Sequence, residues 1–445
     1  MKSYIDFKES AVEWVGDIPA HWSIKNLKYI SNVRASNVDK HLFDTEKRVY
    51  LCNYTDVYYN EYIDKTTPLK IGSCTEDEYI KFKVKKGDVI ITKDSESPDD
   101  IGIPCLIKED LVDTVCGYHL SIITSDPTQI DGNYLFRQFQ TERIQQHYEI
   151  NSFGITRYGL GKAIIENTNL ILPPLPEQQQ IVTYLDEKTA IIDDLILKKQ
   201  RKIELLKEQR TSIINQAVTK GLDANVKMKD SGVEWIGEIP EHWVLQRIST
   251  LGRFSKGGGI KRDEIQTSGL PCIRYGEIYT TYDRIVTTPV SFIAEESSHQ
   301  CEPIEMGAVL FTGSGETMED IGKTVVYMGN ETVYVGGDII VLKLLDTYAP
   351  SFISYLMNCH YVVYQKSLSG RGEIVVHIYA KQLKDIQIAI PPIVEQQNIA
   401  DFLDEKTQTI DAQIVLENQK IGLLKEYRQS LISEVVTGKI DVRIN

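Results

Sequence analysis

Few residues in this chain are spaced in a way that suits a chemical reaction. The nearest match is Gly313-Ser314-Gly315 followed by Gly322-Lys323-Thr324, which together resemble a phosphate-binding loop. Such a loop needs a further glycine at position 317, where this chain has Thr317. Because the amide cradle around a phosphate depends on that glycine, the sequence does not predict nucleotide binding.

DNA modification would leave a different signature, which is also missing from the sequence. A methyltransferase needs a methyl-donor site and either an Asn/Asp-Pro-Pro-aromatic tetrad or a nucleophilic Pro-Cys. Both Pro-Pro pairs of this chain instead follow an aliphatic residue, Leu172 or Ile390, and are expected to end a strand. Asp99, Asp186 and Lys188 are not clustered as a metal-dependent nuclease would require.

Metal ligands and redox-active cysteines are not predicted either. The histidines include no His-Glu-x-x-His and no Cys/His zinc spacing, and His21 and His242 are expected to pack beside Trp22 and Trp243. The 7 cysteines are widely spread without a Cys-x-x-Cys pair, so we expect reduced structural thiols. We therefore predict no catalytic residue, no metal site and no cofactor in this chain.

The composition indicates a folded protein with an acidic balance. Its 445 residues are 42% hydrophobic, which is enough for two or three domains. No apolar run approaches the roughly 18 residues of a membrane helix, and no secretory pattern is seen, so we expect a cytoplasmic protein. The net charge of −14 argues against holding nucleic acid by bulk electrostatics, unless basic residues share one concave face or partner subunits contact the phosphates.

The sequence repeats itself. A block that reads (Ala/Gly)-Val-Glu-Trp-(Val/Ile)-Gly-(Asp/Glu)-Ile-Pro-x-His-Trp occurs twice, and so do Pro-Pro-x-x-Glu-Gln-Gln and Leu-Asp-Glu-Lys-Thr. In that order, the paired occurrences are 11–22 and 232–243, 173–179 and 391–397, and 185–189 and 403–407. The residues between these blocks diverge, apart from echoes such as Asp100-Ile101-Gly102 against Asp320-Ile321-Gly322. The pattern indicates two similar frames with different contents.

A long helix is predicted after each Pro-Pro block. Apolar residues recur there at alternating spacings of three and four, as in a coiled-coil seam. The seam residues are Leu185, Ile192, Ile196, Ile203, Leu206, Ile213, Leu403, Ile410, Ile414, Ile421, Leu424 and Leu431. Each helix should be roughly 50 Å long, and the two should pair antiparallel to bury both stripes. Lys199 and Glu417 are candidates for an interhelical ion pair, with solvation of Lys199 as the alternative.

The segments between the frames are predicted to be mixed α/β modules with short strands. Residues 85–92, 325–327 and 339–342 have the composition of strands, and residues 133–148 and 351–365 have helical spacing. The fold class is therefore α+β, with two modules joined by two long helices that form an antiparallel coiled coil with a pseudo-twofold repeat. The predicted domains are 1–170 with its repeated segment 10–22, the helix 171–222, 223–388 with its repeated segment 231–243, and the helix 389–445.

Two modules joined by paired helices suit a ligand with two separate half-sites. Duplex DNA is such a ligand, because related modules about one helical turn apart, roughly 34–36 Å, can each face a groove of the same duplex. Recognition of bases then needs Arg, Lys, Asn, Gln and small hydroxyl residues on loops.

The repeated blocks, together with Leu-Leu-Lys-Glu at 205–208 and 423–426, resemble the specificity subunits of type I restriction-modification systems over essentially the whole chain. The resemblance implies a non-catalytic chain with two target-recognition domains, each reading one half of a bipartite site, joined by helices that set the gap and dock modification subunits. It also implies partners: double-stranded DNA, two modification subunits that use S-adenosylmethionine to methylate adenine, and restriction subunits that use ATP and Mg.

The DNA-contacting residues are predicted from loop position and residue type, since recognition domains vary most within this family. In the first module we predict Lys93 and Ser95 and, on a loop similar to the Gly-x-Thr-Arg type of such domains, Thr156, Arg157 and Tyr158. In the second module, which has Gly370-Arg371-Gly372-Glu373 in place of that loop, we predict Arg274, Tyr275, Thr312, Ser314, Arg371 and His377. The alternative for each is an ordinary surface loop. Tyr54, Tyr58 and Tyr59 are interpreted as covering a sheet.

Two other functions remain open. One is an enzyme, either a fused methyltransferase-specificity polypeptide or a nuclease, and the purified chain would then methylate or cut DNA by itself. The other is a silent specificity scaffold, which would bind no modification subunit.

Overall fold

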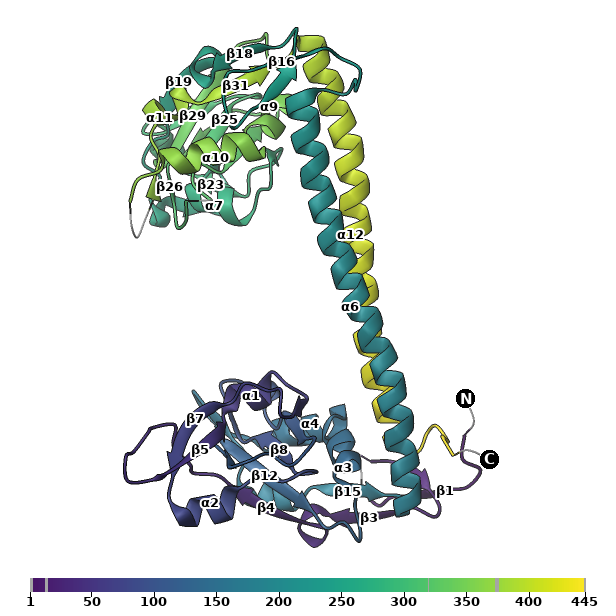
Figure 1. Ribbon diagram of the computed structural model, residues 1–445. Coiled ribbons are helices and arrows are strands. Elements are labelled where there is room, and N and C mark those ends of the chain that lie inside the picture. The colour runs from purple at the N-terminus through teal and green to yellow at the C-terminus, as the bar shows by residue number, and fades with distance from the viewer. Residues whose placement is uncertain (1–2, 13–14, 319, 373–375, 444–445) are drawn as a thin grey trace. The chain divides into compact units, whose positions relative to one another are not determined.

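The computed structural model describes residues 3–12, 15–318, 320–372 and 376–443. It divides into two units, one made of Met1–Gln200 with Asn418–Asn445 and the other of Arg201–Glu417. Each unit holds one α/β module and part of each long helix (Figure 1), so the repeat in the sequence is a repeat in the structure. Glu13 and Trp14 of the first repeated block, and Glu373, lie outside the described residues.

The first module is built on a five-stranded sheet with the order β4-β12-β8-β10-β6, in which β10 and β6 are parallel and the other pairs antiparallel. Its strands are β4 (Ser31–Ala35), β12 (Leu120–Ser125), β8 (Val89–Thr92), β10 (Pro104–Ile107) and β6 (Tyr62–Ile63). Two three-stranded sheets contain β11 (Thr114–Cys116), β5 (Lys47–Cys52) and β7 (Lys70–Cys74), and β13 (Phe153–Gly154), β14 (Tyr158–Gly159) and β9 (Asp94–Ser95). The remaining strand pairs are β1 (Phe7–Glu9) with β2 (Asp17–Pro19), and β3 (Ser23–Asn26) with β15 (Asn169–Leu172).

The second module repeats this sheet with the order β19-β29-β25-β27-β22. Its strands are β19 (Gly252–Lys256), β29 (Ile339–Leu344), β25 (Val309–Thr312), β27 (Thr324–Tyr327) and β22 (Ile285–Val286). A second five-stranded sheet contains β20 (Ile265–Gln266), β23 (Ser291–Ile293), β21 (Leu270–Ile273), β28 (Val333–Val335) and β24 (Glu302–Ile304). The remaining pairs are β16 (Met228–Asp230) with β17 (Glu238–Pro240), β18 (Val244–Arg247) with β31 (Gln387–Ile390), and β26 (Ser314–Gly315) with β30 (Val376–His377). The predicted strands at 85–92, 325–327 and 339–342 are confirmed as β8, β27 and β29.

Short helices cover the sheets, and two long helices follow the modules. The α-helices of the first unit are α1 (Tyr54–Tyr58), α2 (Glu76–Phe82), α3 (Gly132–Phe139), α4 (Glu142–Asn151), α5 (Lys162–Glu166) and the start of α6 (Leu175–Lys220). The second unit adds α7 (Tyr275–Thr280), α8 (Glu295–Ser298), α9 (Pro350–Leu356), α10 (His360–Ser369), α11 (Ala380–Asp385) and the start of α12 (Ile393–Val436). Four short 3-10 turns are Leu27–Tyr29, Pro98–Asp100, Ile248–Thr250 and Arg262–Glu264.

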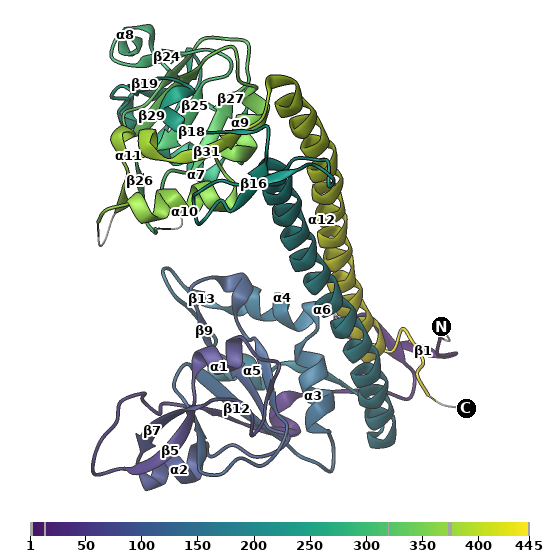
Figure 2. The same ribbon diagram turned by 45° about the horizontal axis from the view of Figure 1, so that its top comes forward.

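The predicted helical segments 133–148 and 351–365 are each divided into two helices. The division falls before α4 and before α10, where Thr141 and Cys359 have an extended backbone and form the N-caps. Aromatic residues spaced along these segments still face the cores, since Tyr134, Phe139 and Tyr148 share one buried cluster and Phe352, Tyr355 and Tyr361 share another. In Figure 2, α3 lies between the sheet and α6.

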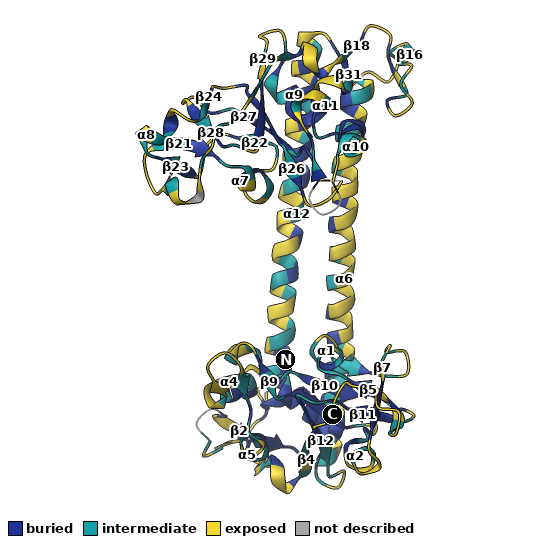
Figure 3. Ribbon diagram, turned by 90° about the vertical axis from the view of Figure 1, so that its left-hand side faces the viewer, coloured by how far each residue is buried: buried dark blue, intermediate teal, exposed yellow. Residues whose placement is uncertain are grey.

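The central strand of each main sheet has a continuously apolar sequence, and its position in the fold explains why. Val89 and Ile91 of β8 face the cluster that includes the long helices, whereas Ile90 faces a second cluster beneath β5 and β11. Because successive side chains point to opposite faces, a strand covered on both faces must be apolar throughout. Figure 3 shows strands of both main sheets, such as β12 and β27, buried and much of both long helices exposed.

Both long helices begin where the Pro-Pro blocks predicted, and they are longer than expected. α6 has 46 residues and α12 has 44, which at about 1.5 Å per residue makes each close to 70 Å. Proline near the start suits a first turn, since its missing N–H has no partner there anyway.

The coiled-coil seam is confirmed within each unit. In the first unit the early part of α6 shares a cluster with the late part of α12, and in the second unit the late part of α6 shares one with the early part of α12, so the pairing is antiparallel. The seam residues Leu185, Ile192, Ile203, Leu206, Leu403, Ile410, Ile421 and Leu431 are buried, and Ile196, Ile213, Ile414 and Leu424 are half-buried. Lys202 donates to Glu417 at 2.9 Å. The ion pair between Lys199 and Glu417 stays a prediction.

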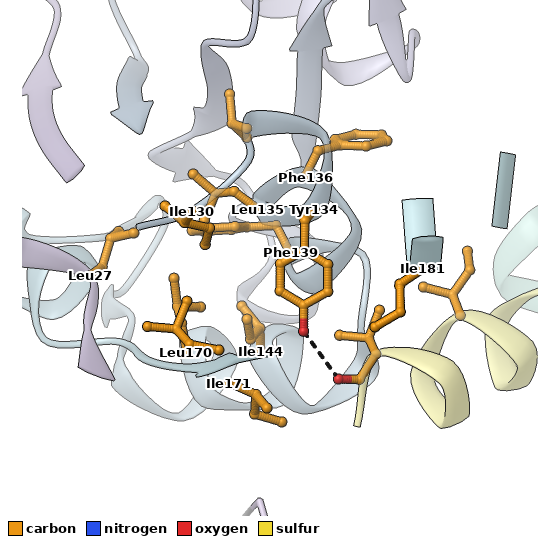
Figure 4. Close-up of a cluster of buried hydrophobic side chains, with 14 of the residues drawn as sticks. Leu27, Ile130, Tyr134, Leu135, Phe136, Phe139, Ile144, Leu170, Ile171 and Ile181 are labelled. Carbon is orange, nitrogen blue, oxygen red and sulfur yellow. Dashed lines mark hydrogen bonds between the residues drawn. The ribbon is translucent and has the colours of Figure 1, made fainter. Parts of the chain in front are cut away.

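The first module contacts the long helices through a hydrophobic core as well as through hydrogen bonds. Figure 4 shows Tyr134 and Phe139 of α3 beside Leu170, Ile171 and Ile181, and the hydroxyl of Tyr134 donates to the carbonyl of Val436 at 3.4 Å. Side chains from the module, α6 and the end of α12 therefore share one buried cluster.

Each module also places a guanidinium against its long helix. Arg137 of α3, with 1% of its side chain exposed, donates to the Tyr62 hydroxyl at 3.0 Å and to Asp186 of α6 at 2.6 Å. In the second unit Arg284, which precedes β22, donates to Tyr355 of α9 at 3.1 Å and to Asp404 of α12 at 2.9 Å.

Arginine and tyrosine have exchanged places between the two copies. In the first copy the tyrosine comes from the edge strand β6 and the arginine from α3; in the second, the arginine comes from the start of the edge strand β22 and the tyrosine from α9. The carboxylate on the long helix is the same, since Asp186 and Asp404 belong to the repeated Leu-Asp-Glu-Lys-Thr block. The orientation of each module on its helix is therefore set by the same three groups.

We expect Asp186→Ala to lower the free energy of unfolding by about 2 kcal/mol, because the guanidinium of Arg137 stays buried without its carboxylate. Urea unfolding followed by circular dichroism measures the change. Glu187→Ala is the matched control: its side chain is 64% exposed, and we expect a change below about 0.5 kcal/mol. Equal losses for the two variants would contradict the role assigned to Asp186.

Candidate nucleic-acid interface

A β-hairpin projects three of the predicted contact residues from the first module. Strands β13 and β14 pair, and the turn between them holds Ile155, Thr156 and Arg157, all exposed. A side chain at Gly154 would place its Cβ 1.9 Å from the carbonyl oxygen of Arg157, so only glycine allows the strands to approach so closely. The hairpin is thus a tight turn that presents an arginine and a threonine to solvent.

Beside the hairpin lies a cavity of about 470 Å³ that gathers predicted and unpredicted residues. Ser95, Thr156 and Arg157 line it, and so do the tyrosines of α1, Tyr54 and Tyr58. Tyr158 joins the same site through strand pairing, since it lies opposite Ser95 in the ladder of β14 and β9. The structure therefore brings four of the five residues predicted for the first module together.

The tyrosines of α1 are held in place by hydrogen bonds at the rim of this cavity. The Tyr58 hydroxyl donates to Asp100 at 2.6 Å, and that bond raises the pKa of Tyr58 to about 12. Burial raises the pKa of Tyr54. Both phenols are therefore protonated at neutral pH, and because Tyr58 already donates its proton to Asp100, its oxygen can accept a further hydrogen bond. The rings of Tyr54 and Tyr58 stack, with centroids 5.6 Å apart.

Lys93 and Ser95 are less accessible than their loop position predicted. The ammonium group of Lys93 donates to the carbonyl of Ser36 at 3.2 Å, and Lys93 is absent from the lining of the cavity. Ser95 is only 6% exposed, and its hydroxyl accepts from the amide of Ser97. Both remain predicted contacts, with backbone partners already in place.

The second module assembles its candidate residues around the short sheet of β26 and β30. The hydroxyl of Ser314 and Nδ1 of His377 lie 2.9 Å apart, and their strands pair at those residues. The backbone of Arg371 exchanges hydrogen bonds with His377 at 3.0 and 2.8 Å, which leaves its side chain exposed. Arg371, Ser314 and His377 therefore share one surface.

Two tyrosines of α7 form hydrogen bonds to that sheet. The hydroxyls of Tyr275 and Tyr279 both donate to the carbonyl of Ser314, at 2.9 and 2.7 Å. Tyr279 also lies 2.8 Å from the hydroxyl of Thr312, and burial raises its pKa to about 12. Thr312 is fully buried, so this predicted contact supports the loop from inside.

Arg274 stands apart from the other residues predicted for the second module. Its Nε donates to the buried carboxylate of Glu277 at 2.6 Å, and the same glutamate accepts from the backbone amide of Arg274. These bonds fix the start of α7. The structure thus gives Arg274 a local role in holding the helix that carries Tyr275 and Tyr279.

A buried lysine contacts the start of β27 in the same module. Lys366 of α10 is 1% exposed, and its ammonium group donates to the carbonyls of Gly322 and Met357 and to the hydroxyl of Thr324, each at 2.7 Å. Burial lowers the pKa of Lys366 from its ordinary 10.5 to about 7.

The pKa of Lys366 predicts a pH dependence of stability. Between pH 7 and about 10.5 the unfolded chain carries a proton on this lysine that the folded chain lacks, so its contribution to stability rises with pH across that range. We expect the free energy of unfolding of the wild type, minus that of Lys366→Met, to be larger at about pH 9 than at about pH 7 in urea titrations. Lys343→Met, at a lysine whose side chain is 47% exposed, is the control and should show no such trend. A difference that shrinks with pH would contradict the lowered pKa.

Sequence reasoning missed the tyrosine helices, although a signal for them was present. Tyr54 and Tyr58 recur as Tyr275 and Tyr279 at the 221-residue offset that also relates the tryptophan blocks. The structure places both pairs on equivalent helices, α1 and α7, beside the candidate contact residues. Covering a sheet was therefore an incomplete interpretation of these tyrosines.

The chemistry that these surfaces offer is hydrogen bonding to a polar ligand. Hydroxyls, phenols, an imidazole and guanidinium groups are the side chains that contact base edges and phosphates. Within the described ranges, no group of three or more His, Cys, Asp or Glu side chains could hold a metal ion. The cysteines are free thiols, as expected, and all but Cys301 are buried. Over the same residues, no helix is long and apolar enough to cross a membrane.

Comparison with known families gives a match to both halves of the chain. The family described as "Type I restriction modification DNA specificity domain" matches residues 19–206 and again residues 240–426. The two matches include the modules, the hairpins and most of both long helices, so the family covers each copy of the repeat.

Two curated relatives match the chain over nearly its full length, and a third matches about half of it. The type I restriction enzyme MjaVIII specificity subunit of Methanocaldococcus jannaschii is 22% identical over 449 residues, which covers 96% of this chain and 94% of that protein. The putative MjaX specificity subunit of the same organism is 21% identical, covering 96% of each chain. The EcoKI specificity subunit of Escherichia coli K12 is 24% identical over 46% of this chain and 44% of its own length.

Solved structures share the fold. A chain from a study of complex assembly and conformational transition of the type I R-M system matches with a TM-score of 0.72 and 16% identity, covering 95% of this chain and 99% of that one. The HsdS subunit from Thermoanaerobacter tengcongensis matches with a TM-score of 0.54 and 17% identity, covering 95% and 98%. The predicted α+β architecture with two long helices is confirmed.

Proposed function

The chain belongs to the type I restriction-modification DNA specificity family, and from that premise we propose that it acts as the non-catalytic subunit that directs its complex to one bipartite DNA sequence. As a specificity subunit with two matched domains, it recognises a target in two parts. The observation that carries the proposal is the repeat itself: two copies of one frame present two different sets of side chains on equivalent loops.

The contact residues of the proposal are those that each module exposes. In the first module these are Thr156 and Arg157 on the hairpin, with Tyr54 and Tyr58 behind them. In the second they are Arg371, Ser314 and His377. Arginine pairs well with guanine and hydroxyls with several bases, so these sets suit different half-sites.

The proposed partners follow from the type of complex. The chain would bind double-stranded DNA together with two modification subunits and, in the restriction complex, the restriction subunits. The long helices support docking of these subunits, because exposed apolar residues such as Leu195, Leu205, Leu416 and Leu423 remain on their surfaces. Catalysis, S-adenosylmethionine, ATP and Mg belong to the partner subunits in this proposal, and the complex would work in the cytoplasm.

Genome-wide mapping of adenine methylation tests the proposed function. A host that carries this gene with its neighbouring modification gene should show one bipartite methylated motif, and deletion of this gene alone should abolish that motif. The motif disappears because methylation without a specificity subunit has no target. An unchanged map, with both proteins expressed, would instead favour the silent scaffold.

Exchange of one module tests whether the two halves are recognised independently. Residues 23–170 would be replaced by another recognition module of the family, keeping Asp186 and the rest of α6. We expect one half of the methylated motif to change while the other half and the gap stay the same, because the second module and both helices are untouched. A change in both halves would contradict independent recognition.

A further inference from the structure

The second module has a hollow of about 560 Å³ in which basic side chains gather. It lies beside the candidate contacts Ser314 and His377, which form part of its wall. Lys256, Lys381 and Lys384 also line it. Such a concentration of positive charge is notable in a chain whose net charge is −14.

Two elements that are distant in sequence position these three lysines. Lys256 is the last residue of β19, the edge strand of the main sheet. Lys381 and Lys384 are three positions apart on α11, so they lie on one face of that helix. After Lys256 the chain runs through Gly258, where a Cβ would meet the carbonyl oxygen of Gln300 at 1.6 Å. Because residue 258 is glycine, the segment after Lys256 can pack closely against Gln300.

The ammonium groups of the hollow are not neutralised by the protein. Within the described residues, no carboxylate lies within 4.0 Å of the amino group of Lys256, Lys381 or Lys384. The neighbouring Asp385 forms an ion pair with Arg247 at 3.2 Å. Asp338 is the single acidic residue among the described residues that line the hollow. The surplus charge is therefore available to an anion.

Part of the lining of the hollow is apolar and aromatic. Phe254 belongs to this part and stacks on Phe311, with centroids 6.4 Å apart. The ammonium group of Lys384 lies over the ring of Phe254, 5.4 Å from its centroid. Contact with the ring holds this lysine at the hollow without using its charge on a carboxylate.

The first module has other residues at the positions of these lysines. The cavity beside its hairpin is lined by Asp94, Glu96 and Asp100, with Arg157 as its basic residue. Asp94 of β9 takes the place that Ser314 has in the second module, and it pairs with His119 at 2.6 Å. Ala35 ends β4 where Lys256 ends β19, and Glu166 follows the buried Ile165 of α5 where Lys384 follows the buried Leu383 of α11. The lysine-lined hollow is thus a property of the second module and not of the shared frame.

We propose that Lys256, Lys381 and Lys384 hold the phosphodiester backbone of duplex DNA next to the bases that the second module contacts. Three ammonium groups without a carboxylate partner around one hollow suit the phosphates of a DNA backbone. Ser314 and His377 in its wall, and Arg371 beside His377, would then face the adjoining groove. Phosphate contacts fix register and orientation without specifying sequence. This inference rests on the proposed function. It assigns to the second module phosphate contacts that hold the complex on DNA by electrostatic attraction.

The test is the salt dependence of DNA binding by the complete methyltransferase complex. Each lysine that contacts a phosphate contributes about 0.9 to the slope of log affinity against log salt, so replacing all three by Gln should lower the slope by about 2.7. Raising the salt from 50 to 200 mM should then cost the wild type roughly 40-fold more affinity than the triple variant. Cognate and unrelated duplexes should weaken by the same factor.

Two variants serve as controls. Replacement of the three lysines by Arg keeps the charge and should retain the slope. Lys343→Gln lies in the same module, where the lysine pairs with Glu302 at 3.2 Å, and should leave the slope unchanged. Thermal unfolding of every variant confirms that the fold is retained.

Several outcomes would overturn the inference while leaving the proposed function intact. One is a wild-type complex that binds its target with a slope the triple Gln variant shares. Another is loss of discrimination between cognate and unrelated DNA at an unchanged slope, which would make the lysines base contacts. A third is inorganic phosphate, at constant ionic strength, that binds to the wild type but not to the triple variant and leaves DNA binding unchanged, which would indicate a site for free anions. A wild-type complex with no preferred sequence at all would instead contradict the proposed function.

Discussion

The first turn of each long helix carries the carboxylate on which the arrangement of its unit depends. Oε2 of Glu177 lies 2.8 Å from the ring nitrogen of His21, and Oε2 of Glu395 lies 2.7 Å from that of His242. The next residue in each copy, Gln178 or Gln396, bonds the backbone on both sides of the junction. A negative charge at a helix N-terminus is also favoured by the helix dipole. The repeated histidine and the repeated Glu-Gln pair therefore hold strand, loop and helix together in both copies. The modules can differ in sequence because these junction residues are the same in both copies.

The two junctions differ in one contact that shows how the repeat tolerates change. In the second copy Oε1 of Glu395 accepts from the indole of Trp243 at 3.1 Å. In the first copy the Tyr4 hydroxyl donates to Oε1 of Glu177 at 2.5 Å, and the indole N–H of Trp22 is buried without a partner among the described residues. The carboxylate is satisfied in both copies by different donors. The exchange of arginine and tyrosine against Asp186 and Asp404 follows the same principle, since the helix keeps its group while the module supplies its partners from either element.

These contacts explain what could be predicted from the sequence. The seam from Leu185 to Leu431 and the starts of both helices were predictable, because heptad spacing and proline pairs are local signals. The exposed turn at Thr156 and Arg157 was predictable for the same reason. Thr312 and Arg274 were chosen by residue type alone, and the structure engages one with Tyr279 and the other with Glu277. The partner of Thr312 is 33 residues away, which no local pattern contains. Glu277 is only three positions after Arg274, but the sequence does not show that its carboxylate is buried.

The basic hollow illustrates the same limit and resolves the difficulty posed by the charge of the chain. Lys256 and Lys384 are 128 positions apart in sequence, and neither belongs to a basic run, so composition registers only their contribution to a net charge of −14. Electrostatic attraction acts over roughly 10 Å at moderate ionic strength, which makes the local arrangement decisive and the distant acidic residues nearly irrelevant. The acidic residues around the cavity of the first module likewise act only over this short range. A subunit that must select one sequence among many benefits from that balance, since a modest number of phosphate contacts lets the base contacts decide where it binds.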